Sequence, residues 1–195
     1  MDLQSRFREV VKTEEDFRGV MGSPSALVTR KELNELDSHA REFIARSPFL
    51  LIGTSGTNGQ IDMSPKGDPP GFVHVLDEKT LAIPDRLGNG RADTFMNLIV
   101  NDQIGLIFFV PGKQETLRVS GRAIIVRDLS IRERMVVGDR LPEFAIVAEG
   151  RSDVLPLREV HDSVKPLEAR ALAHFVWSSV SRRNDGLGWQ AAAIG

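Results

Sequence analysis

One segment in the first half of the chain combines side chains that can contact an anion. Residues 61–71 read IDMSPKGDPPG. Ser64 supplies a hydroxyl, Lys66 an ammonium group, and Gly67 lets the backbone approach a ligand closely. Such groups are suited to hold a phosphate. Taken alone, the segment is more typical of a surface loop with a solvated lysine, because loops are polar by default.

Two later segments carry further basic and polar side chains near the ends of predicted strands. Residues 80–93 read TLAIPDRLGNGRAD, and residues 115–121 read ETLRVSG. Basic residues beside a strand end and a helix N-terminus can together hold a phosphate, although each alone is typical of a solvated charge. The candidates in these segments are Asp85, Arg86, Asn89, Arg91, Thr116 and Arg118.

Other common catalytic motifs have no support. Residues 53–59 read GTSGTNG, but they lack the Gly-Lys-Ser/Thr ending of a phosphate loop and predict a turn. No Gly-x-Gly-x-x-Gly lies between a strand and a helix, and no Gly-x-Ser-x-Gly elbow occurs. The histidines show no metal-ligand spacing, so we expect structural roles and no metal site. They are His39, His74, His161 and His174.

Composition predicts an ordinary globular protein. The chain has 195 residues, enough for one well-buried domain, with 41% hydrophobic and 27% charged residues. A net charge of -2 gives no reason to expect nucleic acid or an anionic membrane as partner. Cysteine is absent, which excludes disulfides, thiolate nucleophiles and Cys-ligated metals. The N-terminus is charged and every apolar run is short, so we expect a cytoplasmic protein without a membrane span.

The first 47 residues predict helices. Apolar residues from Phe7 to Val20 recur at roughly helical spacing among charges. A second helix is predicted to begin near Thr29, with Glu32 completing a capping box, and to end before Pro48. We expect this helical segment to cover the core or to embrace a partner subunit. The apolar stripe of the second helix is Leu33, Leu36, Ala40, Phe43 and Ile44.

From residue 49 the pattern changes to short strands. Asn58-Gly59 predicts a hairpin turn, and Gly121 a β-bulge. Residues 103–110 are so apolar that both faces of this strand should be covered. Antiparallel strands with short helices at 91–100 and 130–137 predict a mainly β (α+β) barrel or sandwich. The predicted strands are residues 49–55, 60–64, 71–76, 80–84, 103–110, 115–127 and 144–149.

In this order, the three polar segments resemble the pyridoxamine 5′-phosphate oxidase-like flavoproteins, whose fold is the FMN-binding split barrel. The resemblance covers about residues 22–149 and is carried by three motifs. They are Ser-Pro-Lys-Gly-Asp-Pro at 64–69, Leu-Ala-Ile-Pro-Asp-Arg at 81–86 and Glu-Thr-Leu-Arg-Val-Ser-Gly at 115–121. The combined match is specific for fold and FMN, and much less so for substrate. It implies a split-barrel core at residues 48–149.

The resemblance also implies an FMN site shared by two subunits of a homodimer. The flavin ring would lie against the strand around Met63, the phosphate would contact Lys66, and no general acid or base stands out. Gly90 stands where relatives often carry a basic residue, and losing such a contact weakens phosphate binding by about 1.5–3 kcal/mol. The implied cofactor contacts are Met63, Ser64, Pro65, Lys66, Pro84, Asp85, Arg86, Asn89 and Arg91, with Thr116 and Arg118 from the neighbouring subunit.

Residues 150–195 form an atypical tail. When residues 150–173 are back-translated and read one nucleotide later, the codons can spell VEAMFFHCAKCMIRSSLWKPEHWP, which resembles the family's usual ending. We therefore predict a frameshift near Gly150. The alternative is an independent tail with an amphipathic helix around Leu172 and Phe175. A frameshift would remove the family's last strand and leave a barrel edge unpaired.

The sequence thus predicts an FMN-dependent oxidoreductase, in which the cofactor performs the electron chemistry. A flavin-binding or flavin-sequestering protein without turnover is the alternative, favoured by Gly90 and by the tail. A split-barrel dimer that binds no flavin is the third. Nothing in the sequence identifies the substrate.

Overall fold

The computed structural model describes residues 2–23, 35–86, 91–150 and 155–159. The chain divides into two compact units, Met1–Lys31 and Glu32–Gly195. The first unit contains the short 3₁₀-helix η1 (Gln4–Arg6) and helix α1 (Glu14–Met21). The second contains all eight strands and the remaining described helices. The predicted start of the second helix at Thr29 lies outside the described residues.

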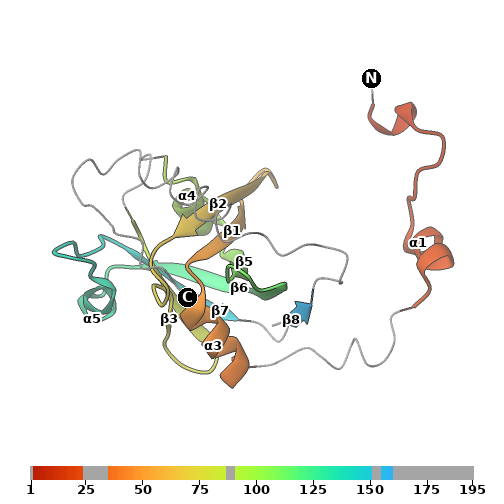
Figure 1. The fold of residues 1–195 in the computed structure, drawn as a ribbon. Coiled ribbons are helices and arrows are strands. Elements are labelled where there is room, and N and C mark those ends of the chain that lie inside the picture. The colour runs from red at the N-terminus through yellow and green to blue at the C-terminus, as the bar shows by residue number, and fades with distance from the viewer. Residues whose placement is uncertain (1, 24–34, 87–90, 151–154, 160–195) are drawn as a thin grey trace. The chain divides into compact units, whose positions relative to one another are not determined.

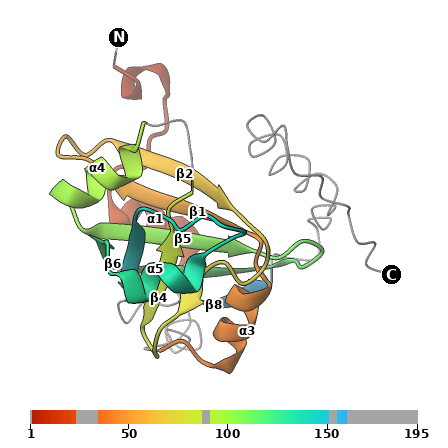
Figure 2. The same cartoon turned by 90° about the vertical axis from the view of Figure 1, so that its left-hand side faces the viewer.

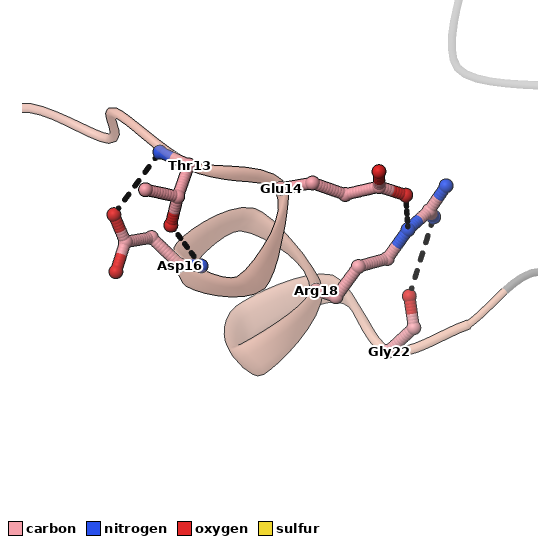
Figure 3. A network of polar contacts seen from close by, with 5 residues as sticks. All are labelled: Thr13, Glu14, Asp16, Arg18 and Gly22. Atoms are coloured by element: carbon pink, nitrogen blue, oxygen red, sulfur yellow. Dashed lines mark hydrogen bonds and ion pairs between the residues drawn. The ribbon is translucent and has the colours of Figure 1, made fainter.

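Helix α1 begins later than the apolar spacing from Phe7 predicts. A capping box sets its start: the Thr13 side chain accepts from the N–H of Asp16, and the Asp16 carboxylate accepts from the N–H of Thr13 (Figure 3). A hydrogen bond from the Thr13 side chain, together with bonds from the N–H groups of Lys12 and Thr13, holds the pKa of the Asp16 carboxyl below its usual value. Glu14 and Arg18 add an ion pair one helical turn apart.

The second unit is built on one antiparallel sheet with the strand order β2-β1-β5-β6-β7-β4-β3 (Figures 1 and 2). Strand β6 is the longest described strand. It pairs with β5 along one edge, and with β7 and β8 along different parts of its other edge. The predicted α+β class is confirmed. The strands are β1 (Phe49–Ser55), β2 (Ile61–Gly67), β3 (His74–Val75), β4 (Thr80–Pro84), β5 (Gln103–Phe109), β6 (Glu115–Val126), β7 (Ala145–Gly150) and β8 (Leu155–Glu159).

Strands β2, β1, β5 and β6 have two different faces. We call the inner face the one that carries the buried side chains Leu50, Ile52, Leu106 and Phe108, and the outer face the opposite one. Outer-face residues of β5, such as Ile107, are only half-buried. In a single copy this face is only partly covered, so the prediction that both faces of the strand are covered stays a prediction.

Two helices complete the packing of this unit. Helix α4 (Asp93–Val100) packs against β1, β2 and β6 and buries Thr94 and Leu98. Helix α3 (Ser38–Arg46) begins after Asp37, whose carboxylate accepts from the N–H of Ala40. The apolar stripe predicted from sequence is buried in its described members, which are Leu36, Ala40, Phe43 and Ile44.

Three predicted elements have different bounds. Strand β2 continues through Pro65 to Gly67 instead of ending at Ser64, because in the described chain β2 pairs only with β1 and a proline is tolerated on such an edge. Strand β3 is reduced to two residues, since Gly71 has a positive φ of 88° and the chain turns there. The helix predicted at 130–137 is a single turn, α5 (Leu129–Arg132), followed by the 3₁₀-helix η2 (Glu133–Met135).

Gly121 is not a bulge. Its pairings with Ile104 on β5 and Gly150 on β7 keep a continuous register. The glycine is required for another reason: a Cβ at this position would lie 2.0 Å from the carbonyl oxygen of Glu149. A glycine in a strand can mark either a bulge or a close backbone approach, and here it marks the approach of β7.

Candidate functional site

Strand β2 carries its polar side chains on the inner face. Asp62, Ser64 and Lys66 alternate with Ile61, Met63 and Pro65, which are exposed on the outer face. Ser64 is paired with Ile52 and Lys66 with Leu50, both of which are fully buried. The Lys66 ammonium donates to Ser64 Oγ at 3.0 Å. A lysine has therefore been placed beside the apolar core, half-buried and held by a neighbouring hydroxyl.

Lys66 and Asp85 influence each other electrostatically. Asp85 follows directly after β4, where its N–H donates to the carbonyl of Phe144 at 2.9 Å. Burial lowers the pKa of Lys66, and the negative charges of Asp85 and Asp62 oppose that shift. Burial likewise raises the pKa of Asp85, and the charges of Lys66 and Arg86 oppose it. Both groups are partly desolvated, and each favours the charged form of the other.

Arg86 joins three parts of the chain. Its Nε donates to a carboxylate oxygen of Asp68, just after β2, and its Nη1 donates to the carbonyl of Met135 at 2.8 Å, at the end of η2. His74 on β3 also senses this region: burial lowers its pKa, and Arg134 and Arg86 lower it further. Arg86 therefore acts on the protonation of both Asp85 and His74.

Polar side chains attach α4 to the strands beneath it. Asn97 donates to Thr54 Oγ1 at 3.0 Å, and Asn101 donates to Ser55 Oγ at 2.7 Å. Thr94, in the first turn of α4, donates to Asp62 at 3.5 Å, a long hydrogen bond. These contacts attach α4 and its C-terminal cap to β1 and β2.

The segment before α4 is described only in part. Arg91 is largely exposed and forms an ion pair with Asp93 at 2.8 Å. Ala92, the residue that caps α4, has a left-handed backbone with φ of 55°. Asn89 and Gly90 lie outside the described residues, so the predicted phosphate contact of Asn89 stays a prediction.

Within one copy of the chain, Thr116 and Arg118 lie on the opposite face of the sheet from Lys66. Thr116 pairs with Phe109 and Arg118 with Ile107, on the outer face of β6. Pro84 is buried at the end of β4, where it pairs with Ala145. Ser64, Lys66, Asp85 and Arg86 are brought together on one side of the sheet, whereas the outer face carries Met63, Pro65, Thr116 and Arg118.

Sequence reasoning missed Asp68 and Asp62 as members of this region. Asp68 belongs to the motif at residues 64–69, but its partner Arg86 is 18 residues away. The alternation of β2 could have pointed to Asp62, because it is in phase with Ser64 and Lys66. Nothing in the spacing could have indicated the ion pair of Asp68.

A family model described as "Pyridoxamine 5'-phosphate oxidase" matches residues 36–179. The chain belongs to this family. The match starts in the segment that precedes α3 and extends beyond Glu149, where the motif resemblance ends. No curated protein sequence matches the chain significantly.

Solved structures also resemble this member of the pyridoxamine 5′-phosphate oxidase family. HupZ from Group A Streptococcus is 18% identical with a TM-score of 0.48, covering 59% of this chain and 89% of its own. A candidate pyridoxamine 5′-phosphate oxidase from Lactobacillus delbrueckii is 16% identical with a TM-score of 0.48, covering 60% and 92%. An FMN-binding protein from Syntrophomonas wolfei is 15% identical with a TM-score of 0.42, covering 56% and 83%. At these values the likeness says nothing about ligand or activity.

Two further findings concern the described residues alone. None of their helices is long and apolar enough to cross a membrane. Among these same residues, no three His, Asp or Glu side chains lie close enough together to hold a metal ion.

Proposed function

We propose that the chain binds FMN and acts as an FMN-dependent oxidoreductase of the pyridoxamine 5′-phosphate oxidase-like class. The observation that carries this proposal is the half-buried ammonium of Lys66. Within the described part of the chain this ammonium forms no ion pair, and its one hydrogen bond goes to the Ser64 hydroxyl. Asp85 and Asp62 act on it electrostatically. A partly desolvated cation with protons left to donate suits an anionic ligand such as a phosphate.

The residues around Lys66 fit this cofactor. Lys66 and Ser64 would hold the phosphate, and the exposed Arg91 before α4 would add a second cation. Asp85 beside Lys66 would favour the protonated lysine that phosphate binding needs. When bound, FMN would supply the electron chemistry, while the protein provides binding and orientation.

The outer face supports the proposal of a homodimer with a shared site. It exposes Ile61, Met63 and Ile124, which are 77%, 51% and 61% accessible in a single chain. Thr116 and Arg118 lie on the same face. A second copy docked there would cover this apolar surface and bring its own Thr116 and Arg118 to the outer side of the edge strand β2, next to Met63 and Pro65.

The flavin proposal is tested by purifying the protein and recording its absorbance spectrum. We expect flavin absorbance that is released as FMN on heating. Lys66→Ala should lose FMN while keeping its circular dichroism spectrum, whereas Lys113→Ala, in the exposed turn after β5, should retain it. A colourless wild-type protein that takes up no FMN, or a Lys66→Ala protein with full FMN, would overturn the assignment.

Turnover is tested separately. Bleaching of bound flavin by NADH or NADPH, followed by reoxidation in air, is the expected result for an oxidoreductase. Flavin that stays oxidised with every donor tried would favour a flavin-binding protein without turnover, the alternative that the missing basic residue at Gly90 suggests.

The shared site is tested by complementation. Lys66→Ala and Arg118→Ala should each bind FMN poorly as homodimers. A co-expressed heterodimer would contain one site with native Lys66 and native Arg118, so it should bind one FMN per dimer. Binding that is no better in the mixture than in either variant would contradict a site formed by two copies.

A further inference from the structure

The pair formed by Asp68 and Arg86 links the two segments that carry the proposed phosphate site. Asp68 follows β2 and is two residues beyond Lys66, while Arg86 is the neighbour of Asp85. The two side chains are 13% and 27% exposed, so the pair is better shielded from solvent than the Arg122–Asp102 pair at 61% and 38%. Shielded pairs are screened less by salt and water than exposed ones.

Each partner has a second attachment. The N–H of Asp68 donates to the carbonyl of Pro48 at 3.1 Å, which ties this residue to the start of β1. Arg86 donates to the carbonyl of Met135 at 2.8 Å, which ties it to η2. The pair therefore fixes the end of β2 against two other parts of the fold.

The end of β2 needs such support. In the described chain this strand pairs with β1 alone, and Pro65 has no N–H to give to any neighbour. Lys66 is thus carried by a strand with only one neighbouring strand in the described chain. The ion pair of Asp68, two residues beyond Lys66, can therefore fix the position of the Lys66 ammonium group.

We propose that Asp68 is a positioning residue for the phosphate-binding Lys66 and that it acts through its ion pair with Arg86. This inference rests on the proposed FMN site and adds a residue to it. In this arrangement Arg86 orients the site, with the Asp68 carboxylate and the Met135 carbonyl accepting from its Nε and Nη1.

The test compares FMN with riboflavin, which carries the same ring without the phosphate. In Asp68→Asn we expect FMN affinity to fall roughly tenfold, the effect of losing an outer partner of a ligating group. Riboflavin affinity should stay unchanged. Asp102→Asn, which breaks the more exposed ion pair with Arg122, should change neither. Both affinities are measured by quenching of flavin fluorescence.

A double-mutant cycle tests whether Asp68 acts through Lys66. In a Lys66→Ala background, Asp68→Asn should produce no further loss of FMN affinity. A second readout needs no flavin: in apo-protein with labelled lysine, the NMR signal of the Lys66 side chain should shift in Asp68→Asn and not in Asp102→Asn. If Asp68→Asn does not fold, Arg86→Lys serves instead, with the same FMN-selective loss expected.

The outcomes separate this inference from the proposed function. Equal losses for FMN and riboflavin, full additivity with Lys66→Ala, or an unmoved Lys66 signal would each reduce Asp68 to a structural ion pair. Those results would leave FMN binding through Lys66 intact. A wild-type protein that binds no FMN would instead overturn the proposed function, together with the role of Asp68 in it.

Discussion

Lys66 Nζ lies 3.0 Å from Ser64 Oγ, and both side chains project from the inner face of β2. Residues two apart on a strand share a face, so this contact follows directly from the strand period. It places the ammonium above buried aliphatic side chains instead of in bulk water. The first four residues of the motif at 64–69 therefore belong to strand β2 and not to a loop.

The first prediction concerns how FMN binding depends on pH. Lys66 must be protonated to attract phosphate, so FMN affinity should fall as the pH rises through the lowered pKa of Lys66. The Asp85 carboxylate raises that pKa. In Asp85→Asn this opposing charge is lost, and the midpoint should therefore move to lower pH. The titration is done above pH 7, where the phosphate, with a second pKa of about 6, is fully ionised.

Asp102→Asn is the matched control for this titration. Asp102 lies just before the start of β5. Lys66 pairs with Leu50, which pairs with Phe108 near the other end of β5. Its removal should leave the midpoint in place. A midpoint that moves upward in Asp85→Asn, or equally in both variants, would show that Asp85 does not act on Lys66.

The second prediction concerns Gly121. Gly121→Ala should destabilise the fold by about 1–3 kcal/mol or more, because its Cβ would overlap the Glu149 carbonyl and β7 would have to move. Gly105→Ala on β5 is the control, since a Cβ there meets nothing within 4 Å. Urea unfolding compares the two. Equal midpoints would contradict the close approach of β6 and β7.

The third prediction concerns Ser47, which is 1% exposed. Its hydroxyl lies 2.7 Å from the carbonyl oxygens of both Phe49 and Phe109, so it bridges the start of β1 and the end of β5. Ser47→Ala would remove this buried hydroxyl donor and should cost about 0.5–1.5 kcal/mol, the usual net worth of one hydrogen bond. Ser130→Ala, at an exposed position in α5, should be neutral in the same thermal or urea unfolding experiment. An unchanged Ser47→Ala would refute the bridge.

Several elements were predictable because local chemistry decides them. Strand β4 has the predicted bounds, and Asn58-Gly59 forms the expected turn, with Gly59 at φ of 72°. Helix α4 ends at Val100, as predicted from the segment 91–100. In each case a few adjacent residues carry the signal.

The misjudged features depend on distant partners. Gly121 was interpreted as a bulge because its real neighbour, Glu149, is on another strand. Strand β2 was ended too early because Pro65 breaks most strands, and only its edge position permits it. The start of α1 is an exception. Its signal, the capping residue Thr13, is local, but the apolar spacing from Phe7 predicted an earlier start.

The candidate site was predicted as a set of residues but not as an arrangement. The family motifs selected Lys66, Asp85 and Arg86, which the fold does bring together. They could not show that Arg86 is held by Asp68, or that Thr116 and Arg118 lie on the opposite face of the sheet. Which face a strand residue occupies depends on register across four strands, and that is a property of the tertiary fold.

The last prediction concerns the attachment of α4. Asn97 donates to Thr54 Oγ1 at 3.0 Å, and Thr54 is 4% exposed. Asn97→Ala should destabilise the protein by about 1–3 kcal/mol, since a buried hydroxyl loses its partner. Thr54→Val combined with Asn97→Ala should restore much of that loss, because removing both polar groups leaves none unsatisfied. Chemical unfolding of the wild type, both single variants and the double variant measures the coupling. Purely additive losses would mean that the Asn97 and Thr54 side chains do not stabilise each other.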